Sequence, residues 1–263
     1  MINIKKLAVQ GLNAKERNVW PTFGSGESLD RTKYVTSSEV GYCGRKVWFD
    51  KETLRNSAYS PEQGTTAGAE MGDSWGVMQR GHTAEAWLID NLRRSEIGGE
   101  LLYAGDEQVS FAHGVQSGTP DGLIAMYMSS VYVFEVKSID PRTNVSNLPR
   151  AAHIAQVTQN CDLVDAAGYD VLGGLIVYVD ASDYSKMHQF ELGFDHTVAD
   201  TLQQKAETIM SATTAAELPP EGIYLDHCKY CAHTGPCSAL VRNNVVKGMK
   251  NDTIAANAKR LFG

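Results

Sequence analysis

The sequence has no long apolar run. Its longest, VLGGLIVYV at 171–179, is less than half of the roughly 20 residues that cross a bilayer as a helix. The first residues, MINIKKLAVQGLNAKER, contain no apolar core of the kind that a signal peptide needs. These two absences lead us to expect a cytoplasmic protein without a membrane span.

An excess of positive charge is also missing. The formal net charge is −7, which argues against a protein that coats nucleic acid by bulk attraction, although a local basic groove is compatible with it. Low-complexity segments, repeats and linkers rich in proline, glycine or serine are absent too. A length of 263 residues with 43% apolar residues then predicts one elaborated domain over 1–263, with its core over 69–213.

Hydrophobic periodicity predicts an alternation of helices and strands. A helix over 37–49, with Ser37 or Ser38 as its N-cap, precedes a longer helix over 69–94. Strand patterns follow at 107–137, 171–180 and 186–194, and helical patterns at 149–167, 196–213 and 240–261. This order is typical of a mixed α/β sheet flanked by helices.

Two carboxylates and a lysine fall in adjacent predicted strands. Asp121 lies in GTPDGLI, just inside one strand, and the next strand carries Glu135 and Lys137 in FEVKS. Side chains two apart on a strand share a face, about 6–7 Å apart, and an antiparallel neighbour can bring Asp121 alongside them. Converging carboxylates suit Mg²⁺ or Mn²⁺, and a lysine beside them can orient water and offset phosphate charge. A surface Glu–Lys pair beside an unrelated turn aspartate would show the same spacing. The apolar VYVF before Glu135 favours a central strand instead, where buried charges are costly unless they are paired or bind a ligand.

The pattern PDG, followed by an apolar strand ending in EVK, resembles the motif of PD-(D/E)XK nucleases. The resemblance implies a restriction-endonuclease-like fold with a mixed central sheet flanked by helices. It also implies that Asp121, Glu135 and the main-chain carbonyl of Val136 bind a divalent cation, Mg²⁺ or Mn²⁺, and that Lys137 is catalytic.

The predicted helix over 69–94 carries His82 and Glu85 on an otherwise apolar inner stripe. A lone histidine on such a face is more often a core residue than a ligand. GHTAE, however, is similar to the histidine motif of the RecB-like branch of these nucleases, in which the histidine adds a metal ligand. That resemblance implies a ligand role for His82, a supporting role for Glu85, and an exonuclease.

The same branch has a Gln-x-x-x-Tyr motif on the helix after the lysine strand. In HIAQVTQNCDLV, Gln156 fits the glutamine and a catalytic role near Lys137, but Asn160 stands where the tyrosine is expected. Gln159, with Leu163 four residues later, gives a second register. A purely structural helix with exposed amides is the alternative.

Four of the five cysteines form a candidate metal site. HCKYCAHTGPC supplies Cys228, Cys231 and Cys237, and Cys43 completes a tetrahedral set. Zinc and an iron–sulfur cluster both accept four thiolates, and His227 and His233 are nearby substitutes. A link from residue 43 to residue 228 closes a long loop and thereby stabilises the fold.

One distant cysteine ahead of the histidine motif and three near the C-terminus resemble the iron–sulfur nucleases of the RecB-like branch, the AddAB-type helicase–nucleases and the CRISPR-adaptation nucleases. This resemblance implies a [4Fe–4S] cluster held by segments 37–49 and 227–238. The fifth cysteine, Cys161, lies among apolar helix residues and is expected to be a small buried residue.

The combined expectation is a metal-dependent DNA exonuclease that acts on single-stranded or duplex ends in recombination, phage DNA processing or CRISPR adaptation. The sequence contains no nucleotide-binding Gly-x₄-Gly-Lys-Ser/Thr motif, so a helicase could only be a separate partner. The alternative is a catalytically inactive DNA- or protein-binding module stabilised by the four cysteines.

Overall fold

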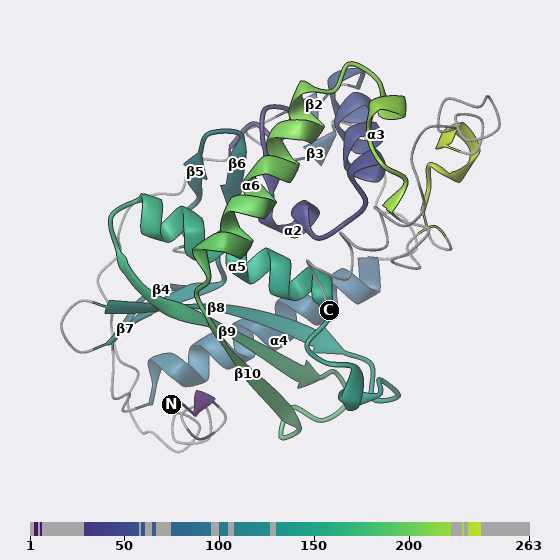
Figure 1. The fold of residues 1–263 in the computed structure, drawn as a ribbon. Coiled ribbons are helices and arrows are strands. Elements are labelled where there is room, and N and C mark those ends of the chain that lie inside the picture. The colour runs from purple at the N-terminus through teal and green to yellow at the C-terminus, as the bar shows by residue number, and fades with distance from the viewer. Residues whose placement is uncertain are drawn as a thin grey trace.

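The computed structural model describes residues 3, 4, 6, 29–57, 59–60, 65–66, 75–95, 100–104, 108–126, 130–221, 228 and 231–237. A five-stranded sheet forms its middle layer (Figure 1). In spatial order the strands are β10 (Met187–Gly193), β9 (Asp170–Asp180), β8 (Ser130–Ile139), β7 (Gly122–Ala125) and β4 (Glu100–Ala104). β8 and β9 run parallel and the other neighbours antiparallel, so the prediction of a mixed sheet is confirmed.

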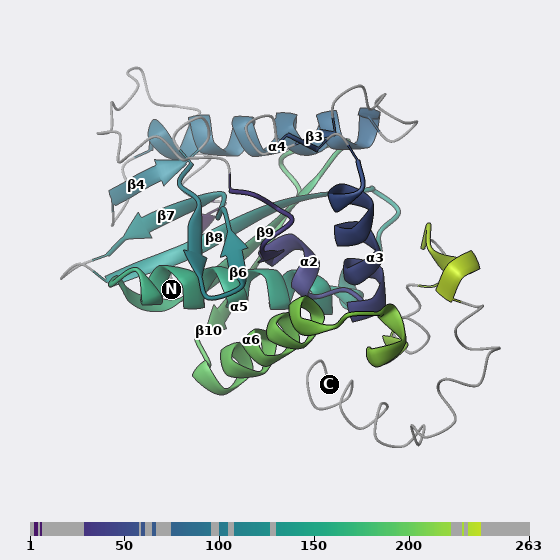
Figure 2. The same ribbon diagram turned by 90° about the horizontal axis from the view of Figure 1, so that it is seen from above.

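Helices cover both faces of this sheet. Figure 2 shows α4 (Trp75–Arg93) on one side, α5 (Ala151–Ala166) on the other, and α6 (His196–Ser211) packed beyond α5. The predicted flanking helices are therefore confirmed. Among the described residues, no helix is both long and apolar enough to cross a bilayer. The helix expected over 240–261 lies outside the described residues.

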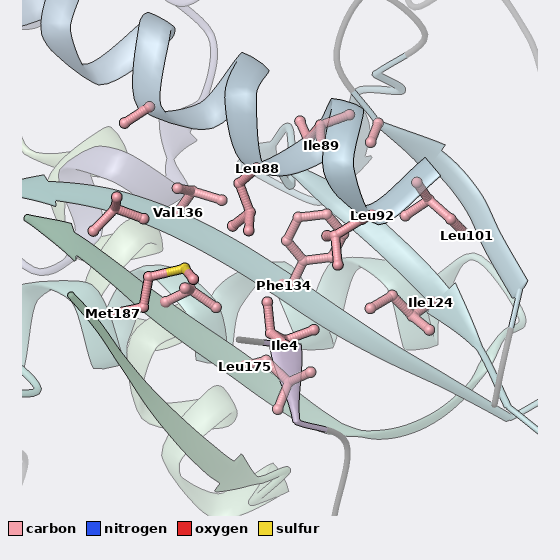
Figure 3. Close-up of a cluster of buried hydrophobic side chains, with 14 residues drawn as sticks. Ile4, Leu88, Ile89, Leu92, Leu101, Ile124, Phe134, Val136, Leu175 and Met187 are labelled. Atoms are coloured by element: carbon pink, nitrogen blue, oxygen red, sulfur yellow. The ribbon is translucent and has the colours of Figure 1, made fainter. Parts of the chain in front are cut away.

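The α4 face of the sheet is held by an apolar cluster (Figure 3). Leu88, Ile89 and Leu92 of α4 pack against Phe134 and Val136 of β8. These helix positions repeat at three- and four-residue intervals, as one buried stripe of a helix requires. His82 is exposed, unlike these residues, so the prediction that it belongs to the buried inner stripe is wrong.

The opposite face of the sheet packs against α5. Val157 and Cys161 of the helix are buried among side chains from β7, β8 and β9. Gly174 of β9 permits this close approach, since a Cβ there would lie 2.0 Å from Cγ1 of Val157. Cys161 is 2% exposed, and burial raises the pKa of its thiol, so the prediction of a small buried residue is confirmed.

The first part of the strand pattern predicted over 107–137 forms a hairpin. β5 (Phe111–His113) and β6 (Gln116–Gly118) are joined by a turn at Gly114, whose φ of +57° favours glycine. They form a small sheet with β1 (Val35–Thr36), in the order β1-β6-β5. A separate pair consists of β2 (Tyr59–Ser60) and β3 (Thr65–Thr66).

The helix predicted over 37–49 is two helices, α2 (Ser37–Val40) and α3 (Gly44–Arg55). The chain turns between them where Gly41 lies against α5, since a Cβ at Gly41 would be 2.6 Å from the Cα of Ala152. The N-cap of α2 is Thr36, and neither Ser37 nor Ser38 takes that position. The main-chain N–H of Thr36 donates to the Glu39 carboxylate at 2.9 Å, which fixes the first turn.

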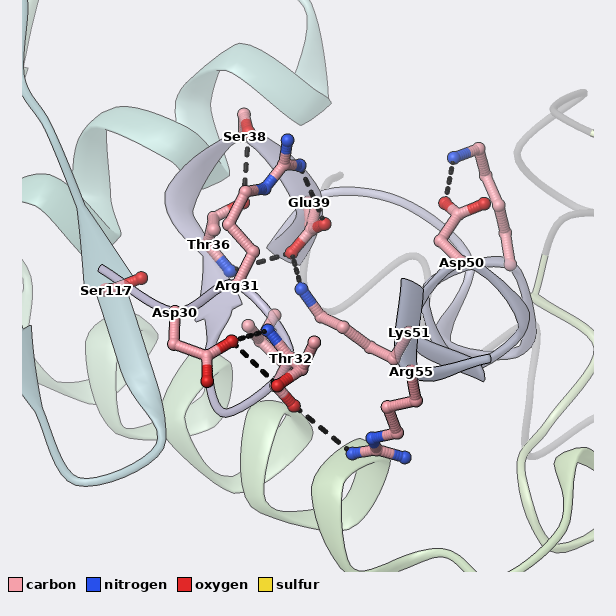
Figure 4. Close-up of polar contacts among 12 residues, drawn as sticks. Asp30, Arg31, Thr32, Thr36, Ser38, Glu39, Asp50, Lys51, Arg55 and Ser117 are labelled. Atoms are coloured by element: carbon pink, nitrogen blue, oxygen red, sulfur yellow. Dashed lines mark hydrogen bonds and ion pairs between the residues drawn. The ribbon is translucent and has the colours of Figure 1, made fainter. Parts of the chain in front are cut away.

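A buried ion pair ties α2 to α3 (Figure 4). Lys51, whose side chain is 1% exposed, donates to one Glu39 oxygen at 2.6 Å, and Arg31 donates to the other at 3.1 Å. Burial favours the neutral form of Glu39, but Lys51, the Thr36 N–H and Arg31 outweigh it and hold the pKa of this carboxyl below its usual value. The corner that carries Cys43 is therefore fixed by charge as well as by packing.

We expect Lys51→Ala to lower the free energy of unfolding by about 3–5 kcal/mol, because it leaves the Glu39 carboxylate buried without its main partner. Urea unfolding followed by circular dichroism measures this change. Lys186→Ala removes a lysine whose side chain is 63% exposed, paired to Asp183, and should cost less than about 1 kcal/mol. Equal losses in the two variants would contradict a stabilising role for the buried pair.

Candidate functional site

The central strand β8 supplies two charged residues to one face. Lys137 donates to Oε1 of Glu135 at 2.5 Å, and Glu135 is only 2% exposed while the lysine side chain remains 25% exposed. The apolar residues before them are buried in the sheet, as the sequence predicted for a central strand. The pair thus lies where the strand leaves the core, with the carboxylate inside and the ammonium at the surface.

Asp121 joins this pair across the neighbouring strand. Gly122 of β7 pairs with Phe134, which brings Asp121 opposite Glu135. Asp121 lies immediately before β7, not inside it, because its carboxylate accepts a hydrogen bond from the main-chain N–H of Val136 at 2.6 Å. This bond fixes the aspartate at the edge of the strand.

The helix α4 adds His82 and Glu85 from the other side. Glu85 is partly buried and accepts a hydrogen bond from Gln108 at 2.8 Å. Its charge interacts with those of Asp121 and Lys137, and the charge of His82 favours the ionised form of Asp121. Two segments far apart in sequence therefore contribute to one charged cluster.

The electrostatics of the cluster show a surplus of negative charge. Burial, followed by repulsion from Asp121, raises the pKa of Glu85 to about 7 and that of Glu135 to about 8. Burial also raises the pKa of Asp121. The pKa of Lys137 is lowered by burial but raised further by Glu135 and Asp121, so its ammonium is retained. One lysine does not neutralise three crowded carboxylates, and such a site favours a cation.

Two amides of α5 hold the Glu135 carboxylate. Gln156 donates to Oε1 at 2.5 Å, which brings the predicted glutamine to the site, and Asn160 donates to Oε2 at 3.3 Å. The sequence reasoning treated Asn160 only as a departure from a motif and missed this contact. Its spacing of four residues from Gln156 was the available signal, since positions i and i+4 share a helix face. Gln159 bonds instead to β1 and β6, so the second register does not reach the site.

The four predicted cysteine ligands lie together, although Cys43 is far from the others in sequence. Cys43, Cys228, Cys231 and Cys237 line one cavity of about 30 Å³. His233, in the same lining, is held by Asp50 at 2.7 Å from its Nε2 and stacks on Phe49. His227 lies outside the described residues.

A buried cation borders the cysteine cavity. Arg45, 1% exposed, donates from Nε to the carbonyl of Leu218 at 2.7 Å and from Nη1 to the sulfur of Cys237 at 3.8 Å. Its Nη2 has no hydrogen-bond partner among the described residues. A buried guanidinium needs negative charge nearby, and thiolates that bind a metal supply it. The residues present therefore fit an anionic thiolate centre.

Within the described ranges, no three His, Cys, Asp or Glu side chains are arranged so as to hold a metal ion. At the sheet, Lys137 and the α5 amides occupy the Glu135 carboxylate. The ligand roles of His82, Asp121, Glu135 and Val136, and of the four cysteines, stay predictions.

No protein-family model and no curated protein matches the chain. Among solved structures it is similar to SSO0001, with a TM-score of 0.47 and 15% identity over 90% of this chain and 94% of that one. It is also similar to an alkaline exonuclease (LHK-Exo) from Laribacter hongkongensis, with a TM-score of 0.46 and 14% identity over 78% of this chain and 95% of that one. The same exonuclease in complex with dAMP gives a TM-score of 0.44 and 18% identity over 78% of this chain and 95% of that one.

We expect Glu85→Gln to stabilise the protein in chelator-containing buffer at pH 8 by roughly 1–2 kcal/mol, after allowance for partial exposure of the side chain. The pKa of Glu85 rises on folding from 4.5 to about 7, so the folded state binds more protons. Wild-type stability should therefore fall between these pH values, and the gain in the variant should be absent near pH 4.5 and complete above pH 7. Urea unfolding at pH 4.5 and pH 8 measures it.

Glu207→Gln on α6 is the matched control, because that side chain is exposed and distant in sequence from the site. It should change stability little at either pH. A Glu85→Gln gain that is the same at both pH values would contradict charge repulsion as its cause.

Proposed function

We propose that the chain is a metal-dependent deoxyribonuclease of the RecB-like branch of PD-(D/E)XK nucleases. One observation carries the proposal: Glu85, Asp121 and Glu135 are crowded beside Lys137 where β8 leaves the core, and the pKa values of all three carboxyls are raised. Excess negative charge next to one retained ammonium suits a divalent cation and a phosphodiester together. A solvated surface cluster would have neither this burial nor these shifts.

The proposed roles come from the resemblance to PD-(D/E)XK nucleases and are supported by the crowding of Glu85, Asp121 and Glu135 beside Lys137. Asp121, Glu135, the Val136 carbonyl and His82 hold the cation, and Glu85 adds negative charge beside Asp121. The cation, when bound, supplies Lewis acidity toward the phosphodiester. Lys137 keeps its proton at neutral pH and, being partly exposed, can donate to a phosphate oxygen or orient the attacking water. The leaving group then departs as a 3′-hydroxyl, and the products carry 5′-phosphates.

We also propose that the protein is an exonuclease that acts on DNA ends. This proposal is supported by the similarity of GHTAE, which contains His82 and Glu85, to a motif that accompanies exonucleases. His82 is exposed, as a site open to a strand end requires. Recombination, phage DNA processing and CRISPR adaptation are the settings that the resemblance suggests.

We expect Asp121→Ala, Glu135→Ala and Lys137→Ala each to lower Mn²⁺- or Mg²⁺-dependent cleavage of end-labelled DNA by at least about 100-fold, because each removes a proposed ligand or the phosphate-facing charge. Single- and double-stranded substrates should be tested in parallel. Glu207→Ala on the exposed face of α6 is the control and should retain wild-type activity.

The same assay tests the mode of action. Linear DNA should shorten from its ends while covalently closed circles stay intact. Prompt linearisation of a supercoiled plasmid would show that the protein is an endonuclease and not an exonuclease. A wild-type protein that binds DNA without cleaving it under any divalent cation would favour the inactive binding module instead.

We further propose that Cys43, Cys228, Cys231 and Cys237 hold a [4Fe–4S] cluster. Their common cavity and the buried Arg45, whose Nη1 donates to the Cys237 sulfur, support an anionic thiolate centre. The preference for iron and sulfide over zinc comes from the resemblance of the cysteine arrangement to that of the iron–sulfur nucleases of the RecB-like branch. Such a centre would join the start of α3 to the C-terminal cysteine segment and stabilise the fold.

We expect protein purified without oxygen to contain acid-labile sulfide and iron, and to absorb visible light through thiolate-to-iron charge transfer. Cys43→Ser should lose this absorbance and unfold at a lower temperature, because the cross-link between distant segments is lost. Cys161→Ser should keep the absorbance, since Cys161 of α5 is buried against the sheet and outside the cavity. Stoichiometric zinc without sulfide would defeat the iron–sulfur assignment and leave the four-cysteine site.

A further inference from the structure

We propose that Asn160 is a positioning residue for Glu135, fixing the carboxylate in the orientation that binds a divalent cation. The inference rests on the proposed nuclease function. It assigns a defined part in the metal site to a residue that does not match the tyrosine of the sequence motif.

The geometry of α5 is the first reason. Gln156 and Asn160 lie one helical turn apart and donate to different oxygens of the same carboxylate, Gln156 to Oε1 and Asn160 to Oε2. Lys137 also donates to Oε1. With donors on Oε1 alone, the carboxylate could turn about its Cγ–Cδ bond, whereas a donor on each oxygen fixes its plane. Groups that orient a metal ligand in this way commonly control how tightly the metal binds.

The burial of Asn160 is the second reason. The residue is 0% exposed, and its Oδ1 has no hydrogen-bond partner among the described residues. That oxygen lies where only glycine leaves room, because a Cβ at Gly118 would be 2.3 Å away. An unpaired buried carbonyl costs free energy, and an apolar residue would avoid that cost. The hydrogen bond from the Asn160 amide to Glu135 explains why an amide stands at this position.

A neighbouring amide provides the contrast. Gln159 is equally buried, but it donates to the carbonyls of Val35 and Ser117 and accepts from Gln116. These bonds join α5 to β1 and β6 and do not touch Glu135. Gln159 therefore serves the fold, while Asn160 serves the carboxylate.

The test compares Mn²⁺ binding with stability in the full chain, without DNA. Asn160→Leu removes both the donor and the unpaired oxygen. It should weaken Mn²⁺ binding, titrated by electron paramagnetic resonance, about 10- to 100-fold, with an unfolding midpoint equal to or above that of the wild type. Gln159→Leu is the matched control and should lower the unfolding midpoint while changing Mn²⁺ affinity less than about 2-fold.

A second variant guards against misfolding of the first. Asn160→Ala removes the donor to Glu135 without adding charge or bulk, so it should also bind Mn²⁺ at least 10-fold more weakly. The inference is overturned if both Asn160 variants bind Mn²⁺ as tightly as the wild type, or if their loss of affinity only parallels a loss of stability. A wild-type protein that binds no Mn²⁺ would overturn the proposed function itself, and with it this inference; unchanged variants of a protein that binds and cleaves would overturn the inference alone.

Discussion

The buried carboxylate of Glu135 is the constraint on which the candidate site depends. A charge in a low-dielectric interior is costly unless hydrogen bonds and opposite charge surround it. Lys137, Gln156 and Asn160 provide those partners, from β8 itself and from α5. They do not fully offset burial and the nearby Asp121, because the pKa of Glu135 remains about 8. The residual imbalance is what a divalent cation would relieve.

This constraint explains the arrangement of the layers around the sheet. β8 is central, and its apolar side chains are buried on both faces of the sheet. On one of these faces, α5 packs closely enough for Gln156 and Asn160 to reach the Glu135 carboxylate. Gly174 permits that approach by leaving room for Val157, and Gly118 leaves room for Asn160. On the other face, Leu88 and Leu92 anchor α4, which carries Glu85 toward Asp121. Packing and electrostatics thus converge at one end of β8.

The spacing of residues along the sequence predicted much of the acidic site. The alternation of Glu135 and Lys137 on a strand follows from two-residue periodicity. The adjacent strand brings Asp121 opposite Glu135, although Asp121 lies just before β7 and not inside a strand as expected. The division of the predicted helix 37–49 into α2 and α3 could not be predicted from local sequence, because it depends on contact between Gly41 and Ala152, which are distant in sequence. The contact of Asn160 was missed for a related reason: a motif describes the residue that is usual, not the one that this packing allows. The exposure of His82 likewise reflects where α4 crosses the sheet, which helical periodicity alone does not fix.

The corner between α2 and α3 connects the two candidate centres. Cys43 and Arg45 stand at the cysteine cavity, while Gly41, two residues earlier, rests on the first turn of α5. The Glu39–Lys51 ion pair fixes this corner from within. α5 also carries Gln156 and Asn160, so the corner and the Glu135 carboxylate contact the same helix. A cross-link at Cys43 would therefore hold a corner that packs on the helix supporting Glu135.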